Sequence, residues 1–301
     1  MRFIQWLVIS LLLVTAAAGV SAQDRVKPFV LAQQTTGAFD DVLAATHARL
    51  DAAGFDVLGE YRPYDGAAVF AVTHEALQSA AQAVETGTWG AVLRVSVTDV
   101  EDAVQVSFSN PVYLAIAYRL EDDLVAVRQQ LVDALGYLED FGAEKGLRPK
   151  SLRKYRYMFG MERVDDLYEL GVFESQREAI NAVEQGLQNN KLPASKVYRL
   201  DLDENTTLYG IGMRGDGDDG KYHDDAYQMS VVDFHDLKGT AYLPYELRVQ
   251  NGEVSALHMR YRMALHYPDL SMMGKHSFMT LRPSPDAIES LLQSVVAGAS
   301  E

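Results

Sequence analysis

The chain has 301 residues, 48% of them hydrophobic, and no cysteine, so burial of apolar side chains must stabilise it without disulfides. The missing cysteines also exclude thiol nucleophiles, cysteinyl metal centres and a lipid attached to a cysteine beside an export cleavage site. The formal net charge of −15 disfavours binding to nucleic acid or to anionic membranes.

Residues 1–22 have the features of a secretory signal peptide. Arg2 is the only charged residue there, the run from Phe3 to Val14 is almost wholly apolar, and Val20-Ser21-Ala22 ends the segment with small residues. This order is typical of a removable export signal, and the run is too short for a convincing membrane span. We therefore expect a periplasmic or secreted protein with no membrane anchoring after signal removal.

Residues 27–140 have the pattern of a first domain. Strands are expected at 27–35, 55–58, 67–73, 91–97 and 103–109, and helices at 38–53, 74–85 and 124–138. Residues 141–170 carry interleaved basic and aromatic side chains, which we interpret as a connector between two domains. One hypothesis is that this connector docks a second copy of the chain, giving a dimer.

Residues 171–298 repeat the order of elements. A helix is expected at 175–189, strands at 196–202, 207–212 and 229–234, a hairpin of 245–250 with 254–265, and a final helix at 285–296. Asn251-Gly252 is the turn signal of that hairpin. The predicted fold class is α+β, with two tandem two-layer domains, each an antiparallel sheet covered by helices on one face, in the rough order β-α-β4-α.

Three segments of the first half carry a family resemblance: Ala52-Ala53-Gly54-Phe55 at a helix end, Ser109-Asn110-Pro111 after a strand, and a helical piece at 112–120. Together they resemble the DUF302 family, a domain of unknown function. The resemblance implies a TBP-like two-layer α/β sandwich and supplies no reaction. Family members often carry a cysteine just before the Asn-Pro pair, where this chain has Phe108-Ser109. The second half is expected to be a divergent copy.

A row of basic residues marks the predicted strand at 257–266. A two-residue period places His258, Arg260, Arg262 and His266 on one face. Arginine side chains suit carboxylate, sulfate or phosphate groups, so one interpretation is a site for a small anionic ligand. The alternative, which the acidic composition favours, is that these cations pair with Asp and Glu of neighbouring elements.

Two other segments contain candidate site residues. Asn110, Tyr113 and Tyr118 follow a strand and can line a pocket at the end of the sheet, or else pack the returning chain onto the helices. The glycine–aspartate segment 216–225 can hold a hard cation, or else be a solvated loop, which is the more usual outcome. No motif indicates a metal or a cofactor, so none is predicted.

The sequence lacks a nucleophile elbow, a phosphate-binding loop and a dinucleotide fingerprint. The favoured hypothesis is therefore a non-catalytic module that binds a small ligand or another protein, in the cleft between the domains or on an open sheet face. The alternative is a hydrolase- or lyase-like enzyme whose chemistry is centred on His258, Arg260, Arg262 and His266.

Overall fold

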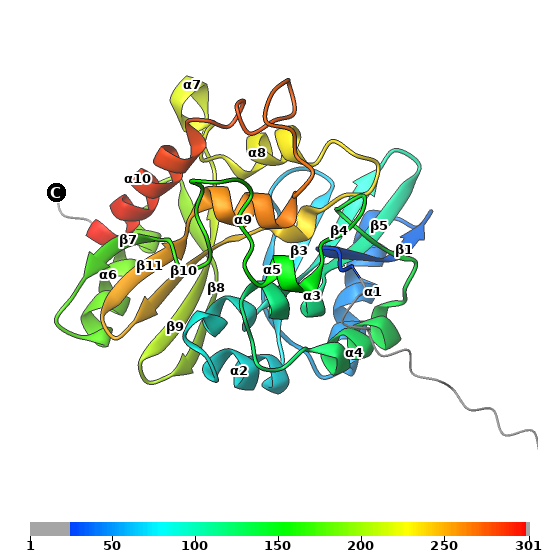
Figure 1. The fold of residues 1–301 in the computed structure, drawn as a ribbon, viewed down its shortest axis with the longest axis horizontal. Coiled ribbons are helices and arrows are strands. Elements are labelled where there is room, and N and C mark those ends of the chain that lie inside the picture. The colour runs from blue at the N-terminus through cyan, green and yellow to red at the C-terminus, as the bar shows by residue number, and fades with distance from the viewer. Residues whose placement is uncertain (1–24, 299–301) are drawn as a thin grey trace, which may run out of the picture.

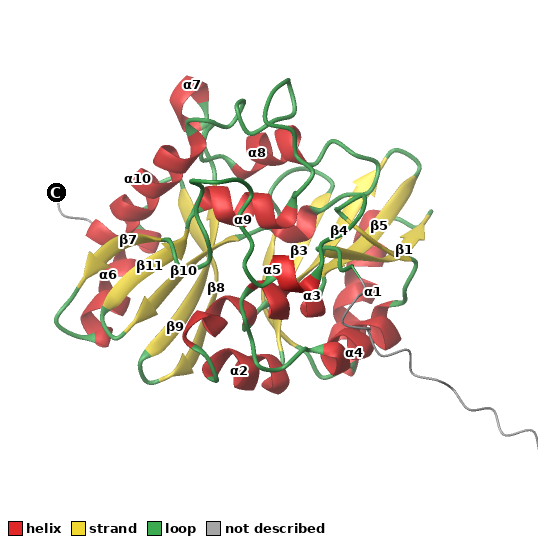
Figure 2. Ribbon diagram, in the orientation of Figure 1, coloured by secondary structure: helices red, strands yellow, loops and turns green. Residues whose placement is uncertain are grey.

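The computed structural model describes residues 25–298 (Figure 1), so the predicted signal peptide lies outside the described residues. Two antiparallel sheets, one of six strands and one of five, form the framework, and helices surround them (Figure 2). The α+β prediction is confirmed. No helix of the part that the structure describes has the length and apolar character needed to cross a membrane.

The first half contains the six-stranded sheet. Its strands are β1 (Phe29–Thr35), β2 (Asp56–Tyr61), β3 (Ala67–Thr73), β4 (Leu93–Val100), β5 (Ala103–Ser109) and β6 (Glu139–Phe141). Its helices are α1 (Phe39–Ala52), α2 (Glu75–Gln82), the short 3-10 helix η1 (Glu85–Gly90), α3 (Pro111–Ala117) and α4 (Val125–Leu135). The helix α5 (Pro149–Leu152) lies within the connector.

The second half contains the five-stranded sheet. Its strands are β7 (Leu167–Val172), β8 (Ala194–Asp203), β9 (Thr206–Met213), β10 (Tyr245–Gln250) and β11 (Glu253–Leu257). Its helices are α6 (Gln176–Gln188), α7 (Gly217–Gly220), α8 (Asp225–Val232), the 3-10 helix η2 (Thr240–Tyr242), α9 (Met259–His266) and α10 (Ser284–Ala297). The predicted Asn251-Gly252 hairpin turn is present, with φ of 53° and 85° at the two residues.

The two halves have the same topology. The first sheet has the order β2-β3-β4-β5-β1 before β6 is added at its edge, and the second has β8-β9-β10-β11-β7. Matching the strands in chain order, β1 with β7 through β5 with β11, makes these two orders identical. α1 corresponds to α6, and α3 with α4 to α9 with α10. The predicted repeat of architecture is therefore present in the arrangement of the sheets.

Each sheet is covered by its own helices on the outer face. In Figure 1, α1 and α4 lie to the lower right, against the six-stranded sheet, and α6 and α10 lie to the left, against the five-stranded sheet. Val95 and Val97 of β4 belong to one hydrophobic core with Leu43 and Leu50 of α1. Thr98, the next residue after Val97 and therefore on the opposite face of β4, contacts the second half by donating to Thr240 Oγ1 at 2.9 Å. The inner faces of the two sheets are thus directed toward each other.

A buried ion pair joins equivalent positions of the two sheets. The caps of α3 and α9, Asn110 and His258, align the two repeats. Ser107, three residues before Asn110, pairs with Ser96 of β4, and Ser255, three residues before His258, pairs with Arg248 of β10. On this alignment Arg94 of β4 and Glu246 of β10 occupy the same position. Their side chains, each 1% exposed, form a salt bridge. Burial disfavours the charge of Arg94, but Glu246 together with Tyr198 and Tyr118 outweighs burial and raises the arginine pKa above its ordinary value.

A tyrosine completes this ion pair. Tyr198 of β8 lies over Gly210 and donates to Glu246 Oε1 at 2.6 Å. Gly210 permits the close approach, because a Cβ there would overlap the Tyr198 ring. Burial, followed by the Glu246 charge, raises the pKa of Tyr198 well above its usual value, so the hydroxyl remains a donor.

The connector contacts both halves. Leu147 forms a β-bridge with Val26, and Asp165 forms a salt bridge with Arg119 of the first half. Tyr155 donates to Ala264 O and Tyr157 to Leu270 O, both at 2.8 Å. Phe159 beyond them is 98% exposed.

The expected strand at 229–234 is wrong, because most of this run belongs to α8. Asp224 Oδ1 accepts a hydrogen bond from Tyr227 N at 2.7 Å and caps the helix. An aspartate cap satisfies amide groups that a helix start leaves free, and it stabilises a helix even over a β-prone sequence.

Candidate functional site

The basic row at 257–266 does not lie on a strand. β11 ends at Leu257, and the residues that follow form α9. His258 caps this helix by accepting a hydrogen bond from Arg260 N at 3.2 Å. The two-residue period therefore does not apply, and the prediction that His258, Arg260, Arg262 and His266 share a strand face is wrong.

Arg262 and His266 are one helical turn apart and both are 1% exposed. Arg262 Nη2 donates to the carbonyls of Tyr242 and Pro244, and its guanidinium lies 4.0 Å from the Tyr242 ring centroid and 4.6 Å from that of Tyr245. Burial, with the Arg262 charge beside it, lowers the pKa of His266 to about 3. Both side chains are closed off inside the protein, although Arg262 Nη1 and His266 Nε2 have no hydrogen-bond partner there, so the pair does not form an open anion site.

His258 and Arg260 face an acidic neighbour instead. Arg260 Nη2 lies 3.1 Å from Glu162 Oε1, and His258 Nε2 lies 3.5 Å from the same oxygen. Burial is the main cause that lowers the pKa of His258. For these two residues the alternative interpretation, pairing with a carboxylate, describes the geometry.

The residues Asn110, Tyr113 and Tyr118 are buried and do not line the cavity described below. Asn110 caps α3 by accepting from Val112 N, and its side-chain amide donates to Lys27 O at 2.9 Å. Tyr113 donates to Leu265 O at 2.6 Å. They secure the returning chain and the contact between the halves, as the packing alternative predicted.

Two of the aspartates at 216–225 have structural roles, and the others in that segment are exposed. Asp224 caps α8, and Asp225 Oδ2 accepts from Tyr61 OH at 2.7 Å and from Met213 N at 2.9 Å. No group of three or more His, Asp or Glu side chains suited to a metal ion occurs within residues 25–298. Burial raises the pKa of Asp225 to about 7.

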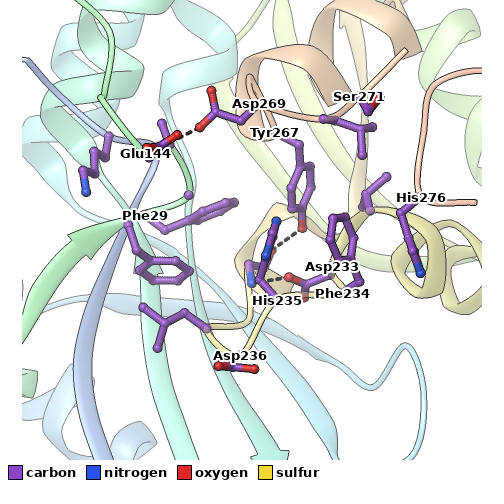
Figure 3. A pocket seen from close by; sticks show the side chains of 18 residues that line it. Phe29, Glu144, Asp233, Phe234, His235, Asp236, Tyr267, Asp269, Ser271 and His276 are labelled. Carbon is purple, nitrogen blue, oxygen red and sulfur yellow. Dashed lines mark hydrogen bonds between the residues drawn. The ribbon is translucent and has the colours of Figure 1, made fainter. Parts of the chain in front are cut away.

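A cavity of about 640 Å³ lies between the halves (Figure 3). The first half contributes Phe29 of β1 and Phe141 of β6, and the second contributes Phe234, Tyr267, Leu237 and Leu270. Most of this wall is aromatic or aliphatic, and the volume is typical of small-molecule sites. His276 stacks on Phe234, with ring centroids 4.4 Å apart. The ring centroid of His235 lies 4.1 Å from that of Phe234.

The segment 233–239 between α8 and η2, which we call the cavity loop, is held firmly. Gln105 of β5 donates to Asp236 O and accepts from Lys238 N, both at 3.0 Å. Tyr267 OH donates to Gly239 O at 2.9 Å, and Lys238 Nζ donates to the carbonyls of Asp233 and His235. Several side chains of the wall are thus preorganised before any ligand arrives.

Asp233 is the ionisable group with the most perturbed environment in this wall. Its Oδ1 accepts from Gly239 N at 2.8 Å, while Oδ2 is inaccessible to solvent and has no hydrogen-bond partner. Burial raises its pKa to about 7, although the Gly239 amide and the Lys238 charge favour the ionised form. A perturbed carboxyl in an apolar cavity is typical of functional sites.

The cavity lies at one of the places where the two repeats differ. Between α2 and η1 the first repeat has only residues 83–84, whereas the second has the whole of 233–239 between α8 and η2. β6, which contributes Phe141, has no counterpart in the second sheet. Sequence reasoning named the cleft between the domains as one possible binding place but missed the residues that form it. The signal that it passed over is the run Asp233-Phe234-His235-Asp236, rich in aromatic and ionisable groups.

Comparison of the chain with protein-family models, with curated proteins and with solved structures yields no match. The resemblance to DUF302 stays a prediction, and the functional argument rests on the geometry of the cavity.

Proposed function

We propose that this protein binds a small ligand in the cavity between its two halves. The observation that carries the proposal is an aromatic-walled space of about 640 Å³ that contains a buried, half-satisfied carboxyl at Asp233. Such a cavity can bury most of the surface of a small organic molecule, and a few polar groups in its wall orient it. The preorganised cavity loop supports binding without a large rearrangement.

We further propose that the ligand is met outside the cytoplasm. The sequence of residues 1–22 supports export. The enzymatic alternative centred on His258, Arg260, Arg262 and His266 loses its support, because two of these residues are buried in protein contacts and the other two pair with Glu162.

A ligand-observed NMR screen of small aromatic and aliphatic fragments tests the proposal. Phe234→Ala removes an exposed ring from the cavity wall, and Phe159→Ala removes an exposed ring from the connector as a matched control. We expect fragments that bind the wild-type protein to lose binding in Phe234→Ala and to keep it in Phe159→Ala. A screen without binders, or binders that are indifferent to Phe234→Ala, overturns the proposal.

A further inference from the structure

The charges around the cavity are strongly one-sided. Glu144, Asp233, Asp236 and Asp269 line it, against a single lining ammonium group, Lys27. Among residues 25–298, no Lys, Arg or His nitrogen comes within 4.0 Å of any of these four carboxylates. The cavity therefore has a net negative field, which Lys27 and the Lys238 charge that acts on Asp233 offset only in part.

The carboxylates lie at two levels. Glu144, Asp236 and Asp269 are exposed and surround the cavity, and Asp269 Oδ2 accepts from Glu144 N at 2.6 Å (Figure 3). Asp233 lies deeper, with its buried Oδ2 unpartnered. The exposed carboxylates attract an incoming cation, and the charge of the buried Asp233 carboxylate acts on it through a low-dielectric environment without direct contact.

The apolar wall suits the same kind of ligand. The faces of aromatic rings carry negative electrostatic potential, so organic cations bind them more strongly than neutral molecules do. Phe29 and Phe141 are neighbours in this wall, with ring centroids 5.4 Å apart, and Tyr267 lies 6.0 Å from Phe29. An anionic ligand would meet the carboxylates with no arginine in the wall to compensate them.

We propose that the cavity binds a small organic cation, a protonated amine or quaternary ammonium ion carried on an apolar body. This inference rests on the proposed ligand-binding function and adds the chemical class of the ligand. The aromatic wall buries the apolar body, and the four carboxylates select the positive charge.

Three probes that share a phenyl ring but differ in charge show whether the cavity prefers cations. Phenethylamine is the cation, 2-phenylethanol the neutral analogue and 3-phenylpropionate the anion. We expect the cation to bind about ten-fold more tightly than the alcohol, and the anion to bind most weakly. If the alcohol or the anion binds as well as the amine, the inference falls and the ligand-binding function stands. If none of the three binds, the inference falls, and the fragment screen decides the function separately.

A pair of double variants tests the carboxylates directly. Asp236→Asn with Asp269→Asn removes two exposed charges beside the cavity, and Asp102→Asn with Asp219→Asn removes two exposed charges elsewhere. Both variants change the net charge equally. We expect the first to weaken phenethylamine binding by about three- to ten-fold with little effect on the alcohol, and the second to change neither. Equal weakening in both variants overturns the assigned role of these carboxylates.

The affinity for the cation should also depend on pH through Asp233. The charged and titratable groups around it are Lys238, Tyr64, Tyr267, His235 and His276. Phenethylamine should bind more tightly at about pH 8 than at about pH 6, because Asp233, whose pKa is raised to about 7 by burial, ionises between these two values. Asp233→Asn should reduce this dependence, and an unchanged pH profile in that variant contradicts a role for Asp233.

Discussion

Tyr113 and Tyr261 occupy the same position in the two repeats, and each donates its phenolic proton to a main-chain carbonyl of the other repeat. Tyr113 of α3 donates to Leu265 O at 2.6 Å, and Tyr261 of α9 donates to Ala117 O at 3.4 Å. Both tyrosines are three residues after the helix cap, and both accepting carbonyls are seven residues after it. The reciprocal bonds tie α3 and α9 together where the halves meet.

Removing the shorter of these hydrogen bonds should destabilise the fold. Tyr113→Phe leaves the buried Leu265 carbonyl without its donor and should lower the free energy of unfolding by about 1 kcal/mol. Tyr261→Phe should cost less, since its bond is longer. Urea unfolding monitored by circular dichroism measures both, and a larger effect for Tyr261→Phe would contradict this ranking.

Substitutions of Arg94 and Glu246 should have strongly non-additive effects on the free energy of unfolding, because the two side chains form one buried salt bridge. Glu246→Leu leaves the Arg94 charge buried and unpaired, and should lower the free energy of unfolding by about 3–5 kcal/mol. The double variant Arg94→Met with Glu246→Leu removes both charges and should recover most of that loss. The same unfolding measurement tests this, and additive effects of the two single substitutions would refute it.

Arg262 and Arg260, two residues apart, should respond very differently to substitution. Arg262→Met removes a guanidinium held between two tyrosine rings and two carbonyls, and should cost about 2–4 kcal/mol of unfolding free energy. Arg260→Met affects an ion pair in which the arginine is 46% exposed, and should stay within about 1 kcal/mol. Similar midpoints of urea unfolding for the two variants would contradict the described environments.

Asp225 predicts a characteristic dependence of stability on pH. Its pKa in the folded protein is about 7, above the value of about 3.9 expected in an unfolded chain. The folded state therefore keeps a proton that the unfolded state releases, and stability falls as pH rises from about 4 to about 7, by up to about 1.4 kcal/mol per pH unit.

Comparison with Asp225→Asn isolates this contribution. His266, with a pKa lowered to about 3, acts in the opposite direction at overlapping pH, and Asp233 acts in the same direction as Asp225. Both remain in the variant, so their effects cancel in the difference. Unfolding free energies of the two proteins should diverge as pH rises, and parallel curves would refute the assignment.

Local signals predicted much of the framework. Asn251-Gly252 specifies its hairpin turn through residues that tolerate positive φ, and Asn110-Pro111 is an evident helix start because asparagine caps and proline suits the first turn. The run from Leu257 to His266 was misassigned because it satisfies two periods at once. Apolar residues alternate along it, yet Arg262 and His266 also fall one helical turn apart. His258 caps α9 as Asn110 caps α3, and this equivalence identifies the run as a helix. The equivalence is hard to see in the sequence because few residues match between the halves.

The candidate site was beyond local reasoning for a different cause. Phe29, Phe141 and Phe234 are far apart in the chain and meet only because the halves pack together. The buried state of Asp233 follows from the same packing. Such a cavity is visible in a sequence only through an unexplained run of aromatic and ionisable residues, here Asp233 to Asp236.

The salt bridge between Arg94 and Glu246 shows what joining two copies in one chain makes possible. In a symmetric homodimer a residue at the two-fold axis meets its own copy, so a buried arginine there would face an arginine. A single chain is free of that constraint, and its two copies can diverge into complementary partners at the centre. The same freedom allows one copy to lengthen the 233–239 segment alone, so that the molecule carries this cavity once rather than twice.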